Sequence, residues 1–355
     1  MMKEALLYRK EKDRIVCTAC VRYCRLTDKA IGFCGIRQRI GDKLFLLNYG
    51  KVIAANIDPI EKKPLFHFFP RSRVLSIGTT GCNLACKYCQ NWDISQRRRV
   101  EGFEFSVKEA VETALEYGCE GVSYTYNEPT IFIEYAYDVG RLAKKHNLFN
   151  TFVSNGYFSL EAIELMKKFL DAITLDFKGN ADPEFLKKYA YVFQPEKIYE
   201  NLIHLKEWDL HVEFTDLVIP RIGDDLKQAE KLLKKIYDEF GENVPIHFLR
   251  FFPHYKLTIL EPTPITILEK HWELAKKIGF NYVYLGNVPG HKYENTYCDE
   301  CGKILIRRFG FDILEWNLEK DKCKFCGNKI PIRVKNDKKN FVEKENKQKT
   351  NFGFL

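Results

Sequence analysis

The cysteines of this 355-residue chain constrain it more than any other feature, because eleven of the twelve fall into three groups. The groups are Cys17, Cys20, Cys24 and Cys34; Cys82, Cys86 and Cys89; and Cys298, Cys301, Cys323 and Cys326. The chain begins with charged residues and shows no apolar secretion signal, so we expect reduced thiols. Reduced thiols at such short spacings predict metal binding rather than disulfides, and the remaining Cys119 is predicted to be an inert buried thiol.

Composition indicates a folded protein with a large core. Hydrophobic residues make up 45% and aromatic residues 14% of the chain, which has no apolar run long enough to span a membrane. We therefore expect a cytoplasmic protein with no membrane partner. The net charge is +8, but residues 333–349 hold seven basic and three acidic residues, a local excess of +4. Half of the excess thus lies near the C-terminus, and a nucleic acid partner is not expected.

From about residue 72 the chain alternates short apolar runs with amphipathic stretches. The expected strands are 74–77, 122–126, 149–153, 172–176, 212–219, 246–251 and 282–285. Ser106 with Glu109 has the spacing of a helix capping box. Thr266 with Glu269 has the same spacing, and Asp182, followed by proline, is typical of a helix start. This alternation predicts an α/β fold, a partial (β/α) barrel with small Cys-rich metal-binding modules at both ends.

Changes in this pattern along the chain predict four regions. We expect an N-terminal Cys-rich region at 1–70, with short strands from 44 to 57, and an α/β barrel at 71–291. A zinc-ribbon-like module follows at 292–333, and a basic, disordered tail at 334–355.

The central group, Cys82-x3-Cys86-x2-Cys89, directly follows the first expected strand of the barrel. Three thiolates are one fewer than a tetrahedral zinc ion or a four-iron cube needs, so one iron would stay open to a further ligand. Gly78 and Gly81 let the backbone pass close to such a cluster. A zinc site completed by a distant residue is the alternative.

This motif, with Tyr88 before its third cysteine, resembles the signature of the radical S-adenosylmethionine (SAM) superfamily. The resemblance implies an oxidoreductase-type enzyme with a four-iron, four-sulfur (4Fe–4S) cluster whose open iron binds SAM. One electron from the cluster would cleave SAM to methionine and a 5′-deoxyadenosyl radical, which would abstract hydrogen from a substrate. An electron donor such as flavodoxin or ferredoxin is implied as a partner.

Five segments together resemble a narrower group, the radical SAM enzyme of the AmmeMemoRadiSam system, which is similar to pyruvate formate-lyase activating enzymes. The segments are the central cysteine motif, 58–65, 126–130, 175–178 and 285–288. The resemblance extends to about residue 330 and leaves the substrate undefined.

The ends of the expected strands supply candidate cofactor-binding residues, because parallel barrels place their active sites there. Glu128 matches the acidic residue of a Gly-Gly-Glu motif that contacts the SAM amino group in the family, although other residues replace both glycines. Ser154 and Asn155 follow the next strand and could hold the ribose or methionine part of SAM. Tyr88 could pack against adenine. Ordinary turns, and plain packing of the tyrosine, are the alternatives.

No residue is assigned firmly to catalysis, but four are candidates. Asp176 and Lys178 stand two residues apart at a strand end and therefore point to the same side. Arg250 suits a carboxylate, and His254 could donate or relay a proton. A structural ion pair between the first two, and an ordinary hydrogen bond for the histidine, are the alternatives.

The flanking cysteine groups differ in regularity. The C-terminal group consists of two Cys-x2-Cys knuckles about twenty residues apart, each followed by glycine, and predicts a four-thiolate zinc ribbon. A rubredoxin-like iron or a second cluster is the alternative there. The N-terminal group has less regular spacing, so zinc and an auxiliary iron–sulfur cluster suit it about equally, with a slight preference for zinc. Zinc would be structural, whereas a cluster would suggest an electron relay.

The favoured function is therefore that of a radical SAM enzyme whose substrate is unknown and could be a protein. A glycyl-radical-enzyme activase is one version of this function. A non-catalytic zinc-binding interaction protein is one alternative. A radical RNA-modifying enzyme is the other, and it draws on the basic tail and the zinc ribbon.

Overall fold

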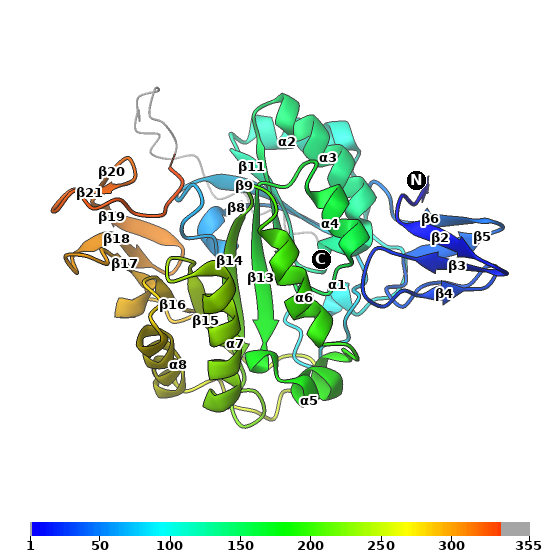
Figure 1. The fold of residues 1–355 in the computed structure, drawn as a ribbon. Helices are drawn as coiled ribbons and strands as arrows, with labels where there is room; N and C mark the ends of the chain where they lie inside the picture. The colour runs from blue at the N-terminus through cyan, green and yellow to red at the C-terminus, as the bar shows by residue number, and fades with distance from the viewer. Residues whose placement is uncertain (1, 335–355) are drawn as a thin grey trace.

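The computed structural model describes residues 2–334, and Figure 1 shows the course of the chain. The basic tail predicted at 334–355 lies outside the described residues, apart from Val334. In Figure 1 the blue N-terminal strands lie on one side of a central sheet, and the orange and red C-terminal strands lie on the other. The two small cysteine-bearing parts therefore flank a central α/β region.

An eight-stranded sheet forms the centre of the molecule. In spatial order its strands are β16 (Val283–Gly286), β15 (Ile246–Arg250), β14 (His211–Val218), β13 (Ala172–Lys178), β12 (Phe149–Ser154), β11 (Gly121–Tyr124), β9 (Arg73–Gly78) and β8 (Ala54–Pro59). Seven of them are parallel, and β8 pairs antiparallel with β9 at one edge. All seven strands expected from the sequence are present, and the sheet is open. The prediction of an α/β fold with a partial barrel is confirmed.

Helices connect the parallel strands and cover one face of the sheet (Figure 1). The longer ones are α2 (Val107–Glu116), α3 (Ile133–Lys145), α4 (Leu160–Met166), α6 (Glu196–Leu205), α7 (Leu226–Phe240) and α8 (Ile265–Ile278). The short ones are η1 (Ile60–Lys62), α1 (Trp92–Ser95), η2 (Pro129–Phe132), η3 (Gly179–Ala181), α5 (Pro183–Phe185), η4 (Leu186–Ala190) and η5 (Lys292–Glu294).

Two of the three predicted helix starts are confirmed. Ser106 forms a complete capping box at the start of α2, and the side chain of Asp182 caps α5. The capping box predicted at Thr266 is wrong, because α8 begins at Ile265, directly after Pro264, so Thr266 lies inside the helix and no side chain caps its start. Proline fixes its own φ and so sets the entry of the chain into the helix without a capping side chain.

The two faces of the central sheet differ in chemistry. On the face beneath the helices, Phe152 and Ile173 are aligned in register and belong to the main hydrophobic core. On the opposite face the register aligns Ser76 with Ser123, and Ser123 with Thr151, and all three side chains are buried. The sheet therefore has one apolar face and one face lined with small polar groups.

The segment that follows β8 fills the N-terminal half of this polar face. The carboxylate of Glu213 accepts hydrogen bonds from the backbone N–H groups of Phe66 (3.0 Å) and His67 (2.7 Å). Ring nitrogens of His211 (2.9 Å) and His247 (2.8 Å) bond to the same carboxylate. Burial alone would raise the pKa of Glu213, but the two histidines hold it well below its usual range. Because this half of the polar face is filled, a binding site for a cofactor or substrate is expected at the carboxyl ends of the strands.

Two small antiparallel sheets make up the N-terminal part. One contains β1 (Lys3–Glu4), β6 (Lys43–Leu46) and β5 (Arg37–Ile40), and the other contains β2 (Tyr8–Glu11), β3 (Arg14–Cys17) and β4 (Arg25–Leu26). Arg37 fastens them to the central region. Its guanidinium donates to the carbonyl of Ile131 (2.8 Å) and to both carboxylate oxygens of Glu134 on α3, and both charged side chains are at most 1% exposed.

The C-terminal part is built on short antiparallel strands beyond β16. They are β17 (Thr296–Tyr297), β18 (Ile304–Phe309) and β19 (Asp312–Trp316) in one sheet, and β20 (Leu318–Glu319) with β21 (Lys322–Cys323) in another. A further pair joins β7 (Lys51–Val52) to β10 (Phe103–Glu104). Leu305, Ile306 and Ile330 form a separate small core against Tyr282 and Tyr284 at the edge of the central sheet.

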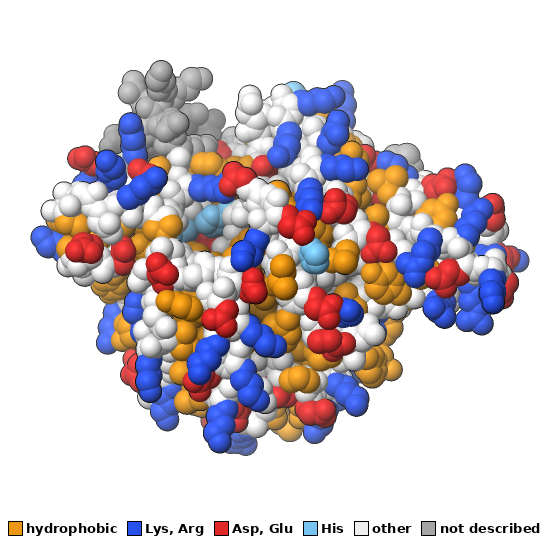
Figure 2. All heavy atoms as spheres, viewed as in Figure 1, with side chains coloured by type: hydrophobic (Ala, Val, Ile, Leu, Met, Phe, Trp, Pro, Cys, Tyr) orange, Lys and Arg blue, Asp and Glu red, His pale blue; other side chains and the backbone are white. Residues whose placement is uncertain are grey.

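Charged side chains of both signs intermingle over the face of the molecule shown in Figure 2. No helix within residues 2–334 is both long enough and apolar enough to cross a membrane.

Replacement Arg37→Met should lower the free energy of unfolding by about 3 kcal/mol or more, because it leaves the Glu134 carboxylate buried without its partner. Guanidinium denaturation followed by circular dichroism measures the change. The control is Glu230→Gln, which breaks the solvent-exposed pair with Lys234 (2.7 Å) and should leave the free energy of unfolding close to that of wild type. Equal losses in the two variants would contradict the role given to the buried pair.

Candidate active site and cysteine clusters

The loop that carries Cys82, Cys86 and Cys89 runs from the carboxyl end of β9 to α1. Asn127, just after β11, holds the start of this loop: its side-chain amide donates to the carbonyl of Gly81 (2.8 Å) and to the hydroxyl of Thr79 (3.1 Å). These contacts place the three thiols at the edge of the sheet where the parallel strands end.

Other segments hold the far side of the cysteine loop. The backbone N–H of Lys87 donates to the carbonyl of Tyr189 (2.8 Å), and the N–H of Lys256, beyond β15, donates to the carbonyl of Lys87 (2.9 Å). Tyr88 points inward, is 3% exposed, and stacks on Phe185 with ring centroids 5.5 Å apart. The loop is therefore clamped on both sides, and Tyr88 serves the packing of its base. Its proposed contact with adenine stays a prediction.

The three thiols of this loop suit a metal cluster. Cys82 is buried, whereas Cys86 and Cys89 are partly exposed, so one side of the triad is accessible. Burial raises the pKa of Cys86 to about 12 and also raises the pKa of Cys89. Thiols with raised pKa values stay protonated at neutral pH unless a metal displaces their protons. Three such donors, with no fourth cysteine in the loop, fit a 4Fe–4S cluster that keeps one coordination position open.

Three of the predicted cofactor-binding residues lie together. The carboxylate of Glu128 accepts hydrogen bonds from the hydroxyl of Ser154 (2.9 Å) and from the backbone N–H of Asn155 (2.9 Å). It also accepts from the N–H and the hydroxyl of Thr130, and burial raises its pKa. The amide of Asn155 donates to the side chain of Asn83 (2.8 Å), next to the first cluster cysteine. These contacts favour a positioning role for Glu128; the contact of any of these residues with SAM stays a prediction.

Two of the four catalytic candidates also lie beside the cysteine loop. Lys178 and Asp176 form an ion pair at the end of β13 and are 18% and 21% exposed. The hydroxyl of Thr215 on β14 donates to Asp176 (2.7 Å). Burial raises the pKa of Cys86, and the nearby Lys178 ammonium opposes that shift, as it does at Cys89. The pair therefore faces the thiols.

The other two candidates belong to the segment after β15. The guanidinium of Arg250 donates to the carbonyl of Thr263 (2.9 Å). His254 is half-buried, and the next residue, Tyr255, stacks on Trp92 just beyond the cysteine loop, with centroids 5.3 Å apart. The structure thus brings this segment to the same loop, and the roles of Arg250 and His254 stay predictions.

Sequence reasoning missed several residues that build the site. Asn127 and Asn83 fix the cysteine loop, and Tyr126 donates from its hydroxyl to Asp58 on β8 (2.8 Å). Asp58 also pairs with Lys63 (2.7 Å), which is 2% exposed on its side chain. The sequence does place these charged and amide side chains next to apolar strands. That position could have identified them, because such groups are rarely buried without a partner.

The C-terminal cysteines form a compact set. The sulfur atoms of Cys298 and Cys326 are 3.6 Å apart, and those of Cys301 and Cys323 are 3.8 Å apart. All four lie within 4.8 Å of one another. Four thiolates around one zinc ion, at a bond length of about 2.3 Å, are separated by about 3.8 Å. The geometry therefore fits a single tetrahedral ion.

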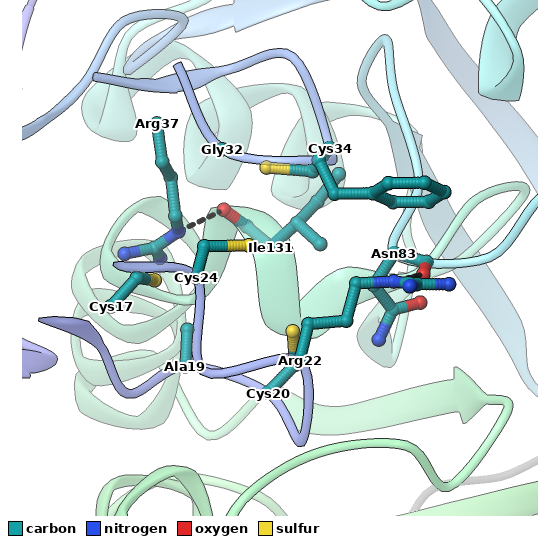
Figure 3. A pocket seen from close by; sticks show the side chains of 11 residues that line it. Cys17, Ala19, Cys20, Arg22, Cys24, Gly32, Cys34, Arg37, Asn83 and Ile131 are labelled. Carbon is teal, nitrogen blue, oxygen red and sulfur yellow. Dashed lines mark hydrogen bonds between the residues drawn. The ribbon is translucent and has the colours of Figure 1, made fainter. Parts of the chain in front are cut away.

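The N-terminal cysteines line one pocket together with Arg22 and Arg37 (Figure 3). Cys119, outside all three groups, is 5% exposed, and burial raises its pKa to about 12. A buried, protonated thiol of this kind is chemically inert.

Comparison with known proteins identifies the family. Residues 76–236 match the model of the radical SAM superfamily. This range includes the cysteine loop and the carboxyl ends of β11 and β12. The chain is also 42% identical, over 93% of its length, to "Uncharacterized protein MJ0808" of Methanocaldococcus jannaschii, and covers 99% of that protein. The chain belongs to the radical SAM superfamily and is an enzyme.

More distant matches include activating enzymes. The chain is 26% identical over half of its length to the (2S)-3-sulfopropanediol dehydratase activating enzyme of Klebsiella oxytoca, of which it covers 56%. Among solved structures, a domain of a pyruvate-formate lyase-activating enzyme from Bacteroides vulgatus matches 47% of this chain and 99% of that domain, with 14% identity and a TM-score of 0.41.

Asp216, next to this site on β14, is a buried carboxyl group with an incomplete set of partners. Its Oδ1 atom accepts a hydrogen bond from the backbone N–H of Asn180 (3.1 Å), while Oδ2 is buried with no hydrogen-bond partner among the described residues. Burial raises its pKa to about 7. The folded state therefore prefers the protonated form, and stability is lost as the pH rises through 7.

We expect Asp216→Asn to stabilise the protein more at pH 8 than at pH 5.5, by about 2 kcal/mol, because only the wild-type carboxyl group ionises over this range in the folded state. Guanidinium denaturation at both pH values measures the difference. Asp238→Asn, at an exposed position on α7, is the control for the loss of one carboxyl group. A stabilisation by Asp216→Asn that is the same at both pH values would contradict the raised pKa.

Replacement Cys301→Ser should lower the zinc content of the purified protein by about one ion per chain, because three thiolates and a hydroxyl bind zinc less tightly than four thiolates. Metal analysis by mass spectrometry measures this loss, and the buried Cys119→Ser variant is the control that keeps its zinc. Iron in place of zinc at this site would contradict the prediction.

Proposed function

We propose that Cys82, Cys86 and Cys89 hold a 4Fe–4S cluster which, with SAM bound, supplies one-electron reductive cleavage of SAM and a 5′-deoxyadenosyl radical for hydrogen abstraction. The observation that carries this proposal is the position of three thiols in one loop, at the edge where the parallel strands of the sheet end. Membership of the radical SAM superfamily supports the same chemistry.

The residues around the loop have defined tasks in this proposal. Glu128 fixes Ser154 and the backbone of Asn155, and Asn155 in turn bonds to Asn83 beside the first cysteine. These polar groups orient the cofactor at the ends of β11 and β12. Both carboxylate oxygens of Glu128 already accept hydrogen bonds from the protein. We therefore assign Glu128 the positioning of these groups rather than direct binding of SAM.

The ion pair on β13 provides charge on the other side of the cysteine loop. The Lys178 ammonium lies near the thiols of Cys86 and Cys89 and favours negative charge there. Asp176, held by Thr215, keeps that ammonium in place. We assign this pair to the binding of a carboxylate of the cofactor or the substrate, since an ammonium group that is 18% exposed can still accept an anionic partner.

A protein is the substrate class that the molecule favours. Two relatives of this chain are named as activating enzymes, one of a dehydratase and one, putatively, of glycyl-radical enzymes. The sheet is open at its edges, and the β18–β19 hairpin beyond β16 exposes Phe309 (54%), Phe311 (46%) and Leu314 (63%). Hydrophobic side chains grouped on a surface mark a contact site for another protein. Glycyl-radical-enzyme activation is the version of this function that the relatives favour.

Reconstitution with iron and sulfide without oxygen, followed by dithionite and SAM, should yield 5′-deoxyadenosine, which chromatography quantifies. Cys86→Ala should lower the yield by about 100-fold or more, because it removes one of the three cluster ligands. Cys119→Ala is the matched control, since it removes a buried thiol outside all three groups and should keep the activity. Equal yields from wild type and Cys86→Ala, or no product from either, would overturn the proposal.

A further inference from the structure

The three cysteine groups differ in how closely their sulfur atoms approach. Within residues 2–334, the C-terminal four form the one set in which three or more metal-ligand atoms lie within 4.8 Å of one another. Neither the N-terminal four nor the three of the catalytic loop form such a compact set. Yet Cys17, Cys20, Cys24 and Cys34 all line a single pocket. Figure 3 shows their side chains around it, Cys17 at the end of β3 and the other three beyond that strand.

This spacing separates zinc from an iron–sulfur cluster. Thiolates on one zinc ion stand about 3.8 Å apart, because each is about 2.3 Å from the same atom. Thiolates on a four-iron cube stand roughly 6 Å apart, because each binds a different corner of the cube. The C-terminal sulfurs, at 3.6 and 3.8 Å, match the first case. The N-terminal four line a pocket and form no compact set of that kind among the described residues, so their arrangement favours the second case.

The charges around the N-terminal pocket suit an anionic metal centre. Arg22 and Arg37 line the pocket and place two guanidinium groups beside its four cysteines. A cube or a zinc ion with four thiolates carries a net charge of about −2 in either case. The arginines therefore support a metal centre, and the arrangement of the four cysteines around a pocket, without a compact set, favours a cluster over a single ion.

The N-terminal pocket touches the catalytic loop directly. The carbonyl oxygen of Cys34 lies 2.2 Å from where a side chain at Gly81 would begin, so these two loops pack backbone against backbone. Arg98 donates both to the carbonyl of Phe33 and to the carbonyl of Cys82 (3.4 Å), and Arg22 donates to the carbonyl of Asn83. Arg22 thus joins the two ligand loops directly, and Arg98 bridges them from beyond α1.

We propose that Cys17, Cys20, Cys24 and Cys34 hold a second 4Fe–4S cluster, with every iron bound by the protein, which passes single electrons to the catalytic cluster. A one-electron donor of the flavodoxin or ferredoxin class is oxidised and reduces the second cluster from its 2+ to its 1+ core. The second cluster returns to 2+ as the catalytic cluster goes from 2+ to 1+. Four protein ligands leave no iron open to SAM, so the second cluster carries electrons and not substrate. The relay rests on the proposed function, whereas the second cluster does not.

Iron, sulfide and zinc analysis of protein purified without oxygen tests the second cluster. Wild type should contain about eight iron ions and one zinc ion per chain, and Cys20→Ser/Cys24→Ser should keep about four irons. The triple variant Cys82→Ala/Cys86→Ala/Cys89→Ala should also keep about four irons, and these belong to the N-terminal site. Four irons with two zinc ions in wild type, or no iron in the triple variant, would overturn the assignment.

The triple variant keeps this test independent of the proposed function, because it retains all four N-terminal ligands and cannot cleave SAM at the catalytic loop. Its remaining cluster should give an electron paramagnetic resonance signal after reduction that SAM does not alter. Cys119→Ser is the control for the loss of any buried thiol and should match wild type in iron, sulfide and zinc. A signal that shifts with SAM would overturn full ligation by the protein.

The relay is tested with Cys20→Ser/Cys24→Ser that retains about four irons and one zinc ion, which shows that the rest of the protein is folded. With reduced flavodoxin or ferredoxin as the electron source, its formation of 5′-deoxyadenosine should fall about tenfold or more below wild type. With dithionite, a small reductant that reaches the catalytic cluster directly, its rate should stay close to that of wild type. Equal rates with the protein donor, or the same loss with both reductants, would overturn the relay.

Discussion

The site depends on one close approach of two backbones. Gly81 has φ of +87°, and a side chain there would meet the carbonyl oxygen of Cys34 at 2.2 Å, so only glycine fits. Asn127 fixes the same glycine from the other side through its carbonyl. The first thiol of the catalytic loop is therefore positioned by the N-terminal part and by the end of β11 at once, and neither part can move without displacing it.

The chemistry of the central sheet divides along the strands. On the polar face, Glu213 gathers two histidines and two backbone N–H groups and closes the N-terminal half. A carboxylate with four donors is stable when buried, so this half needs no water. At the other end, Glu128 gathers Ser154 and the backbone of Asn155 beside the cysteine loop. At both ends of the sheet a buried carboxylate accepts several hydrogen bonds. Glu213 thereby fills the N-terminal half of the polar face, and Glu128 positions the polar groups beside the cysteine loop.

Local sequence patterns predicted much of this fold. The seven parallel strands, the caps at Ser106 and Asp182 and the three cysteine groups all follow from residues near one another in the chain. The antiparallel pairing of β8 with β9 and the contact of Glu213 with Phe66, 147 positions away, depend on long-range packing that no local pattern contains. For the same reason no local pattern contains the hydrogen bonds that Glu128 accepts from Ser154 and Asn155, which lie 26 and 27 residues further on.

The spacing of cysteines along a chain does not determine the spacing of their sulfur atoms. Cys298 and Cys326 stand 28 positions apart and still approach to 3.6 Å, because two knuckles fold against each other over a small core. Cys17 and Cys20 stand only three positions apart, yet together with Cys24 and Cys34 they line a pocket and form no compact set of that kind. The sequence can therefore indicate that thiols bind metal, whereas the fold determines whether one ion or a cube of four irons fits between them.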